Sequence, residues 1–327
     1  MILATDLTGF PAKRFPNLVV ALGVFDGMHR GHRVILKKVR AEAKKIGGKT
    51  AVLTFHEHPQ NVLTPEKKTE LLTSFWHKLS LLENEGVDLC ISLRFSEAFS
   101  RLSPEEFVTR ILLRKLKVKT VVLGHDSRFG YQREGDARLM AELARKFGFR
   151  LITVRALNVA GGTVSSTRIR KLIAEGNIPL AKRLLGRECS VVASVVKGRG
   201  RGRKLGFPTA NLNPHSEVLP PDGVYVIRVR SVEFQLSGAG CGFKRFLVKK
   251  PDFSWPAIMN LGTSPTFQRS AKVRVPEAHI LKFQGNLYGK TLEVDFLTRL
   301  RSEMKFPTPE ALQAQIVQDI REAERFF

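Results

Sequence analysis

Two histidines on either side of a glycine, His29 and His32 around Gly31, have the residue types and spacing to bind phosphate. They follow an apolar run over residues 18–22 that predicts a buried parallel strand, and they precede a helical pattern that ends at Gly47. A turn from strand to helix gathers backbone N–H groups and the positive end of the helix dipole. The pattern is therefore suited to holding a nucleoside triphosphate while its α-phosphate is attacked. An isolated pair of surface histidines is the simpler alternative, which the flanking strand and helix disfavour.

The whole segment of residues 23–32, Gly-Val-Phe-Asp-Gly-Met-His-Arg-Gly-His, resembles the signature of the nucleotidyltransferase superfamily and of bacterial FMN adenylyltransferases in particular. The resemblance implies catalytic roles for His29 and His32. It implies nucleotide-binding roles for Gly23, Phe25, Asp26, Gly27 and Gly31.

A second motif covers residues 165–170, where Arg168 and Arg170 fall in the first turns of a predicted helix. Positive charge at a helix N-terminus is unfavourable unless an anion is bound, and a triphosphate would supply one. A capped surface helix is the alternative, and it accounts for the serines but not for the arginines. The motif is similar to the Ser-Ser-Thr-x-Ile-Arg of flavin adenylyltransferases. The resemblance implies catalysis by Arg168 and nucleotide binding by Ser165, Ser166, Thr167 and Arg170.

The segment His56-Glu57-His58-Pro59 follows a β-branched run over residues 50–55. Its spacing does not fit a helical zinc motif, and Pro59 is expected to break any helix here, so we expect no metal ligation. The segment resembles one at the mouth of the FMN adenylyltransferase site. This resemblance implies that His58 lines the site.

The segment of residues 124–130 resembles a further family loop. Asp126 is interpreted either as a site residue or as a turn aspartate that bonds its own backbone. Ser127 stands where the family usually has phenylalanine, which predicts weaker stacking on a flavin or adenine ring.

Apolar runs alternate with helical patterns through the first half of the chain. Strands are predicted at residues 18–22, 50–55, 87–92, 120–123 and 151–154, and helices at 75–85, 103–114, where Ser103 begins a capping box, and 138–147. This alternation predicts an α/β domain with a Rossmann-like, doubly wound parallel sheet. Ligands bind at the carboxyl ends of such strands, where His29, His32, His58 and Asp126 fall.

After residues 184–187 the pattern changes to short strands with Gly and Pro turns, which predicts a small antiparallel β-barrel. Thr308 begins a last amphipathic helix that runs to about residue 326. We therefore expect two domains, residues 1–185 and 186–327.

The segment of residues 198–212 is the strongest motif of the second half. Glycines and basic side chains suit phosphates, and the oxygens of Thr209 and Asn211 suit Mg²⁺. An RNA-binding arginine-glycine tract is the alternative for its first part. The remainder closely resembles the riboflavin kinase signature. The resemblance implies substrate binding by Gly198, Gly202, Lys204, Gly206, Phe207 and Pro208, and metal binding by Thr209 and Asn211.

Glu277 lies on the polar side of a predicted strand over residues 276–283, where a carboxylate is most often simply solvated. The strand resembles the Glu-x-His strand of riboflavin kinases, whose glutamate is the general base toward the ribityl hydroxyl. The resemblance implies that role for Glu277.

Residues 231–255 depart from the riboflavin kinase pattern, because the family is usually shorter here. We interpret them as a long solvated hairpin. A contact between an anion and the basic stretch at residues 244–250 is a second interpretation.

Composition sets the outer limits. The chain has 327 residues, enough for two cores, and its net charge of +24 suits nucleic acid, anionic membranes or phosphorylated substrates. The basic residues are scattered, so we expect neither a nucleic-acid nor a membrane partner. Cys90, Cys189 and Cys241 show no metal-ligand spacing, and Cys90 is expected in the core. Without a secretory or membrane-spanning pattern, a cytoplasmic location is expected.

The resemblance as a whole implies a bifunctional riboflavin kinase and FMN adenylyltransferase of the prokaryotic FAD synthetase family, with riboflavin, FMN and ATP as substrates and Mg²⁺ as cofactor. Two alternatives stay open. One is a riboflavin kinase with a weak or inactive adenylyltransferase domain, because of Ser127. The other is an RNA-binding protein on a nucleotidyltransferase scaffold. The sequence leaves the oligomeric state open.

Overall fold

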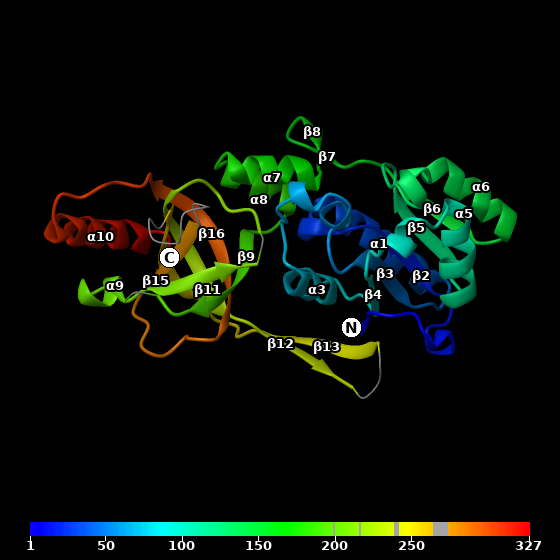
Figure 1. The fold of residues 1–327 in the computed structure, drawn as a ribbon, viewed down its shortest axis with the longest axis horizontal. Coiled ribbons are helices and arrows are strands. Elements are labelled where there is room, and N and C mark those ends of the chain that lie inside the picture. Colours follow the sequence, from blue (N-terminus) through cyan, green and yellow to red (C-terminus); the bar gives the residue numbers. More distant parts are fainter. Residues whose placement is uncertain (199, 216, 239–241, 264–273) are drawn as a thin grey trace. The chain divides into compact units, whose positions relative to one another are not determined.

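The computed structural model of the chain describes residues 1–198, 200–215, 217–238, 242–263 and 274–327 (Figure 1). Cys241 therefore lies outside the described residues. The chain divides into two compact units. The first comprises Met1–Thr69, Phe75–Ser166 and Phe234–Leu247, and the second comprises Glu70–Ser74, Thr167–Glu233 and Val248–Phe327.

The first unit contains a parallel sheet that confirms the Rossmann-like prediction. Its parallel strands lie in the order β1-β4-β3-β2-β5-β6. Their bounds are β1 Ile2–Ala4, β2 Val19–Leu22, β3 Thr50–Phe55, β4 Leu89–Leu93, β5 Thr120–Gly124 and β6 Arg150–Val154. All five predicted strands are present, whereas β1 was not predicted. β3 lies on one side of β2 and β5 lies on its other side, so the order of strands along the chain reverses direction beside β2. Ligands bind at such a point in open parallel sheets.

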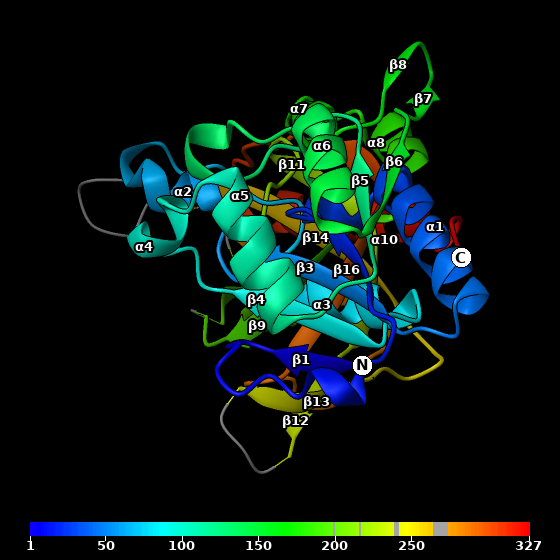
Figure 2. The same ribbon diagram turned by 90° about the vertical axis from the view of Figure 1, so that its right-hand side faces the viewer.

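Helices cover both faces of this sheet (Figure 2). α5 (Pro104–Glu106), the π-helical η4 (Phe107–Lys115) and α6 (Ala137–Phe147) lie on one face, where Leu112 and Leu143 share a core with Leu53. α1 (Arg30–Lys45) contacts β2, β3 and β5, and α3 (Phe75–Asn84) contacts the loop after β2. The predicted capping box is present. Shorter elements are η1 Ala12–Arg14, η2 Asp26–Met28, α2 Pro59–Leu63, η3 Pro65–Lys67, α4 Glu97–Ser100, η5 Tyr131–Arg133, β7 Asn158–Val159 and β8 Gly162–Thr163.

The hairpin of β12 (Glu233–Ser237) and β13 (Phe243–Lys249) extends this same sheet, although it lies in the second half of the sequence. β13 pairs antiparallel with β1, and Figure 2 shows both hairpin strands beside it. The predicted hairpin is therefore present, and its described strand residues are exposed or half-buried except for Phe246. Phe246 is fully buried, and its ring lies nearly parallel to those of Phe234 and Trp76, with centroids 6.2 Å and 6.3 Å away. Burial of Phe246 against Phe234 and Trp76 holds the hairpin on the sheet.

The second unit contains a closed antiparallel barrel, as predicted, with strand order β10-β15-β14-β11-β16-β9. The bounds are β9 Cys189–Val196, β10 Ala210–Pro214, β11 Gly223–Ser231, β14 Trp255–Thr263, β15 Arg274–Ile280 and β16 Thr291–Arg301. The predicted last helix is α10 (Pro309–Glu324), capped by Thr308, and its buried Asp319 accepts three hydrogen bonds from the guanidinium of Arg301, at 2.7, 2.9 and 3.2 Å. The remaining helices are α7 Ser166–Ala174, α8 Ile178–Leu185 and α9 Arg201–Lys204.

Phe246→Ala tests the hairpin. Because Phe246 is fully buried against Trp76 and Phe234, we expect the substitution to lower the free energy of unfolding by about 3–5 kcal/mol, measured by urea unfolding of the whole chain. Phe253→Ala is the control, because that ring is 60% exposed, and it is expected to cost about 1 kcal/mol or less. Equal losses of unfolding free energy in the two variants would contradict the packing of Phe246 against the rest of the unit.

Candidate active sites

The loop after β2 has a strained backbone. Phe25 and Met28 have φ of 55° and 41°, in the left-handed region that side chains disfavour, and Gly27 between them has φ of 80°. Each non-glycine residue in such a conformation costs about 1 kcal/mol or more. Phe25 and Met28 are nevertheless almost fully buried, so packing holds the loop in this shape.

His29 is the N-cap of α1. Its Nδ1 accepts the backbone N–H of His32 at 3.3 Å, so in the neutral ring the proton lies on Nε2, which is then a donor. A side chain on Gly31 would place its Cβ 3.2 Å from the His29 ring and 3.7 Å from the carbonyl oxygen of Val164. The glycine between the histidines thus leaves room for the first imidazole and for the segment that contains Val164.

His32 stacks on His29, with ring centroids 3.6 Å apart and planes 15° apart, and Phe25 lies against its other side at 5.0 Å. Burial holds the pKa of His32 well below its usual 6.5, and the neighbouring His29 and Lys78 lower this pKa further. Its Nδ1 atom is buried and has no hydrogen-bond partner within the described chain. His32 is therefore a neutral imidazole near pH 7, able to act as a hydrogen-bond donor but not as a cation.

The second motif reaches the same loop through Ser166, whose hydroxyl donates to the carbonyl oxygen of Asp26 at 2.9 Å. This bond brings residues 165–166 to the loop that precedes His29. Arg168 and Arg170 follow in the first two turns of α7, and both belong, as Thr167 does, to the second compact unit.

Two other predicted residues lie at carboxyl ends of strands. His58 follows β3, and its Nδ1 caps α2 by accepting the N–H of Gln60 at 3.2 Å. The expectation that Pro59 breaks any helix is wrong, because Pro59 is the first residue of α2, where its missing N–H has no cost. Asp126 follows β5 and its side chain is 76% exposed. A role for Asp126 in the site therefore stays a prediction.

Ser127 lies where the loop after β5 approaches α1. A Cβ on Gly124 would lie 3.4 Å from the hydroxyl of Ser127 and 3.6 Å from the side chain of Ile35, one turn beyond His32. Phe129 of the same loop packs against Phe107, with ring centroids 5.8 Å apart. The aromatic ring of this segment therefore belongs to the core, and the hydroxyl of Ser127 and the side chain of Ile35 both lie near Gly124.

Sequence reasoning missed Lys78 of α3, which is buried and donates to the carbonyl oxygen of Phe55 at 2.8 Å. A signal was available, because Lys78 shares one helix face with Phe75 and Leu82. Cys90, predicted in the core, is fully buried, and burial raises the pKa of its thiol to about 12.

The barrel unit aligns the predicted kinase residues through strand register. Asn211 of β10 is paired with Glu277 of β15, which is paired with Asn260 of β14. Paired residues on neighbouring strands point to the same face of a sheet, so Asn211, Glu277 and Asn260 share one face, and Thr209 immediately precedes β10. The neighbouring residues Leu212, Ala278 and Leu261 are buried on the opposite face. Asn260 was not predicted as a site residue, since its pairing depends on the register of distant strands.

Two glycines of the motif lie against these side chains. A Cβ on Gly198 would collide with the side-chain amide of Asn211, and a Cβ on Gly202 would lie 3.0 Å from the hydroxyl of Thr209. Gly206 has φ of 83°, which favours glycine. The motif loop is held from α10, where Gln313 donates to the carbonyl oxygen of Leu205 at 3.3 Å.

Pro208 and Phe207 contact the strand of Glu277. A ring nitrogen of His279 lies 2.8 Å from the carbonyl oxygen of Pro208, and the ring of Phe207 meets the His279 ring edge to face at 5.8 Å. These contacts fix the loop beside β15. Lys204 lies in α9, and its side chain is outside the described part of the structure.

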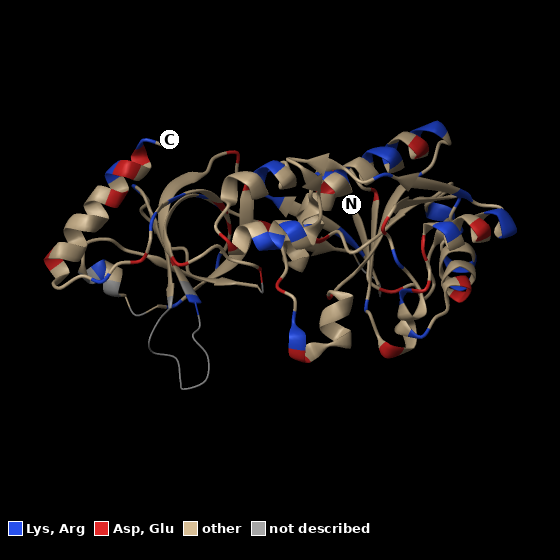
Figure 3. Cartoon of the chain, turned by 90° about the horizontal axis from the view of Figure 1, so that it is seen from above, with Lys and Arg blue, Asp and Glu red and all other residues tan. Residues whose placement is uncertain are grey.

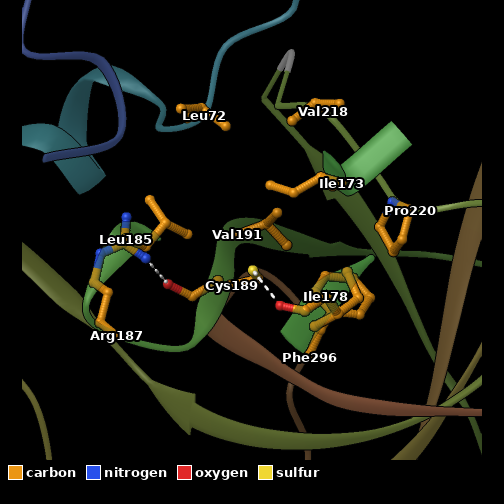
Figure 4. Close-up of a pocket in the computed structure, with 11 residues that line it drawn as sticks. Leu72, Ile173, Ile178, Leu185, Arg187, Cys189, Val191, Val218, Pro220 and Phe296 are labelled. Atoms are coloured by element: carbon orange, nitrogen blue, oxygen red, sulfur yellow. Dashed lines mark hydrogen bonds between the residues drawn. The ribbon is translucent and has the colours of Figure 1, made fainter. Parts of the chain in front are cut away.

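A pocket in the second unit contains none of the predicted site residues (Figure 4). It is lined mainly by apolar side chains, including Leu72, Ile178 and Phe296. The thiol of Cys189 lies 3.9 Å from the carbonyl oxygen of Ile178, and burial raises its pKa to about 12, so it is not a nucleophile near pH 7. This pocket is an imperfectly filled part of the core.

Three further features concern metal ligands, membrane-spanning helices and the distribution of charge. Among the described residues, no group of three or more His, Cys, Asp or Glu side chains is placed to hold a metal ion. No helix in those residues has the length and apolar character needed to cross a bilayer. Lys and Arg occur on helices and strands throughout both units, with Asp and Glu among them (Figure 3).

Comparisons with known proteins decide the family. The FAD synthetase family model matches residues 12–168, and the riboflavin kinase family model matches residues 185–327. A bifunctional riboflavin kinase/FMN adenylyltransferase from Escherichia coli K12 is 34% identical over 310 residues, 94% of this chain and 92% of that protein. Its namesake from Buchnera aphidicola subsp. Schizaphis graminum is 32% identical over 312 residues, 95% of this chain and 94% of that protein. The chain belongs to the bifunctional riboflavin kinase/FMN adenylyltransferase family.

As a bifunctional riboflavin kinase/FMN adenylyltransferase, the protein is a transferase with both an FAD synthetase and a riboflavin kinase domain. This confirms the predicted family and function over the RNA-binding alternative. A crystal structure described as a macrolide-efflux protein from Streptococcus pneumoniae has a TM-score of 0.80 at 28% identity and covers 99% of each chain. The likeness in fold therefore spans the whole enzyme.

The pKa of His32 predicts a dependence of stability on pH. Because this pKa is lower in the folded than in the unfolded chain, protons bind preferentially to the unfolded chain as the pH falls through about 6.5, and stability is lost. His32→Asn removes this effect. Between pH 7.5 and 5 the melting temperature of both proteins should fall. We expect the fall for His32→Asn to be smaller than that for the wild type by about 2–4 °C.

The control is His125→Asn, which replaces a half-exposed histidine of the same unit. Its melting temperature is expected to fall as much as that of the wild type. Identical falls for all three proteins would contradict a lowered pKa for His32.

Proposed function

We propose that residues 1–185 transfer the AMP moiety of ATP to FMN, and that residues 186–327 phosphorylate riboflavin with ATP. The observation that carries the kinase assignment is the ladder pairing of Glu277 with Asn211. It sets a carboxylate beside an amide on one face of the barrel. The corresponding support for the first activity is the bond from Ser166 to the loop of His29 and His32.

In the kinase reaction, Glu277 accepts the proton of the ribityl hydroxyl as that oxygen attacks the γ-phosphorus of ATP. The donor set fits Mg²⁺, since the hydroxyl of Thr209 and the carboxamide oxygen of Asn211 are hard oxygen ligands from neighbouring positions of the chain. Mg²⁺ held there would neutralise phosphate charge. Gly198, Gly202 and Gly206 would let the triphosphate approach the backbone, and Lys204, Phe207 and Pro208 would complete the substrate site.

In the adenylyl transfer, a phosphate oxygen of FMN attacks the α-phosphorus of ATP, the bond to the bridging oxygen breaks and pyrophosphate leaves. His29 and His32 would donate hydrogen bonds to the phosphates, and Arg168 and Arg170 would supply positive charge. Gly23, Phe25, Asp26, Gly27 and Gly31 would shape the nucleotide site, with Ser165, Ser166 and Thr167, and His58 and Asp126 would line its edge. A cytoplasmic location stays a prediction.

One assay tests both activities. The purified enzyme is incubated with riboflavin, ATP and Mg²⁺, and the flavins are separated by chromatography. We expect FMN first and FAD after it. FMN without FAD would favour an inactive adenylyltransferase site, for which Ser127 is the candidate cause. Absence of both FMN and FAD would contradict both assignments.

Glu277→Gln separates the two sites. We expect FMN formation to fall by about 10²–10⁴-fold, because the amide cannot accept the hydroxyl proton. FAD formation from supplied FMN should stay within about twofold of the wild type. Glu324→Gln, an exposed carboxylate of α10, is the matched control and should leave both rates unchanged. An equal loss of both activities by a folded Glu277→Gln enzyme would contradict separate sites.

A further inference from the structure

Lys78 lies directly beneath the adenylyltransferase loop. Its side chain comes from α3, is 6% exposed, and points its ammonium at the ends of two neighbouring strands. Nζ lies 2.8 Å from the carbonyl oxygen of Phe55, at the end of β3, and 3.4 Å from that of Val24, just after β2. Burying a lysine is costly, so a position of this kind is functional more often than incidental.

The acceptors match an ammonium. A third contact, also 3.4 Å, runs from Nζ to the hydroxyl of Thr54, which in turn donates to the carbonyl oxygen of Val24 at 2.9 Å. An ammonium has three N–H donors, and here it meets three oxygens. Through Lys78 and Thr54 the carbonyl oxygen of Val24 is held from two directions, one residue before the strained Phe25.

We propose that Lys78 is a positioning residue for adenylyl transfer. It fixes the loop after β2 to β3, and so sets His29 and His32 against the phosphates. This inference rests on the function proposed above.

Charge adds a second consequence. Burial lowers the pKa of Lys78, while Cys90 and Asp26 oppose this shift. Burial also lowers the pKa of His56, and Lys78 adds to the effect. The titratable and charged groups that act within this network are Asp26, His29, His32, His56, Glu57, Lys78, Cys90 and Arg94. Because Lys78 lowers the pKa of His32, its loss should make His32 easier to protonate.

The test is Lys78→Met in the full chain. We expect kcat for FAD formation from FMN to fall about 100-fold, since small displacements of positioning groups have effects of this size. FMN formation from riboflavin in the same protein should stay within about twofold and so reports on folding. The acid limb of the pH profile of FAD formation should move to higher pH, an effect that loss of packing alone would not produce. Lys37→Met, on the exposed side of α1, is the control.

Two further variants separate the hydrogen bonds from the charge. Lys78→Arg should leave the acid limb in place even if kcat falls. Thr54→Val, which removes one bond to Val24 without changing charge, should lower kcat without moving the limb.

The outcomes separate the two proposals. FAD formation by Lys78→Met within about threefold of the wild type would overturn the role of Lys78 alone, and absence of FAD formation by the wild type would overturn the proposed function. Should Lys78→Met lose both activities, Lys78→Gln decides. Movement of its acid limb to higher pH supports the inference, and an unmoved limb overturns it.

Discussion

Backbone carbonyl groups at the ends of buried parallel strands run out of ladder partners, and the first unit depends on how they are satisfied. At β2 and β3 the chain meets this need with side chains, as Thr54 and Lys78 reach the carbonyl oxygens of Val24 and Phe55. The loop that follows adopts left-handed conformations at Phe25 and Met28, which persist because their surroundings over-determine them. The strained residues of this loop, their burial and the position of the histidine pair that follows thus depend on one another.

The two candidate sites of this family member are built on different principles. The first depends on loops at the point where strand order reverses beside β2, with His29 as the cap of the helix that follows. The second depends on a barrel ladder, in which Asn211, Glu277 and Asn260 are aligned by hydrogen-bond register alone. A ladder fixes residue spacing firmly, which suits a metal and a base that must stay close together.

Much of this could be predicted from the sequence, because the deciding signals are local. The run Thr50–Phe55 and the caps at Ser103 and Thr308 each determine their own element, and the motifs carried the family. Three features depend on distant partners and were missed or misjudged. β1 has only three residues, Lys78 is buried by contributions from three elements, and β13 pairs with a strand more than 200 residues away. Whether the predicted site residues act as proposed is a question for the assays.

The hairpin of β12 and β13 has a consequence for how the enzyme is made. The sheet of the first unit is complete only when residues 234–247 have joined β1, yet these residues are synthesised after the barrel strands β9, β10 and β11. A nascent chain that ends near residue 185 therefore carries an uncovered edge on β1, with free backbone groups that invite association with other chains. Final closure of the amino-terminal sheet on the ribosome must wait for a segment encoded in the distal half of the message.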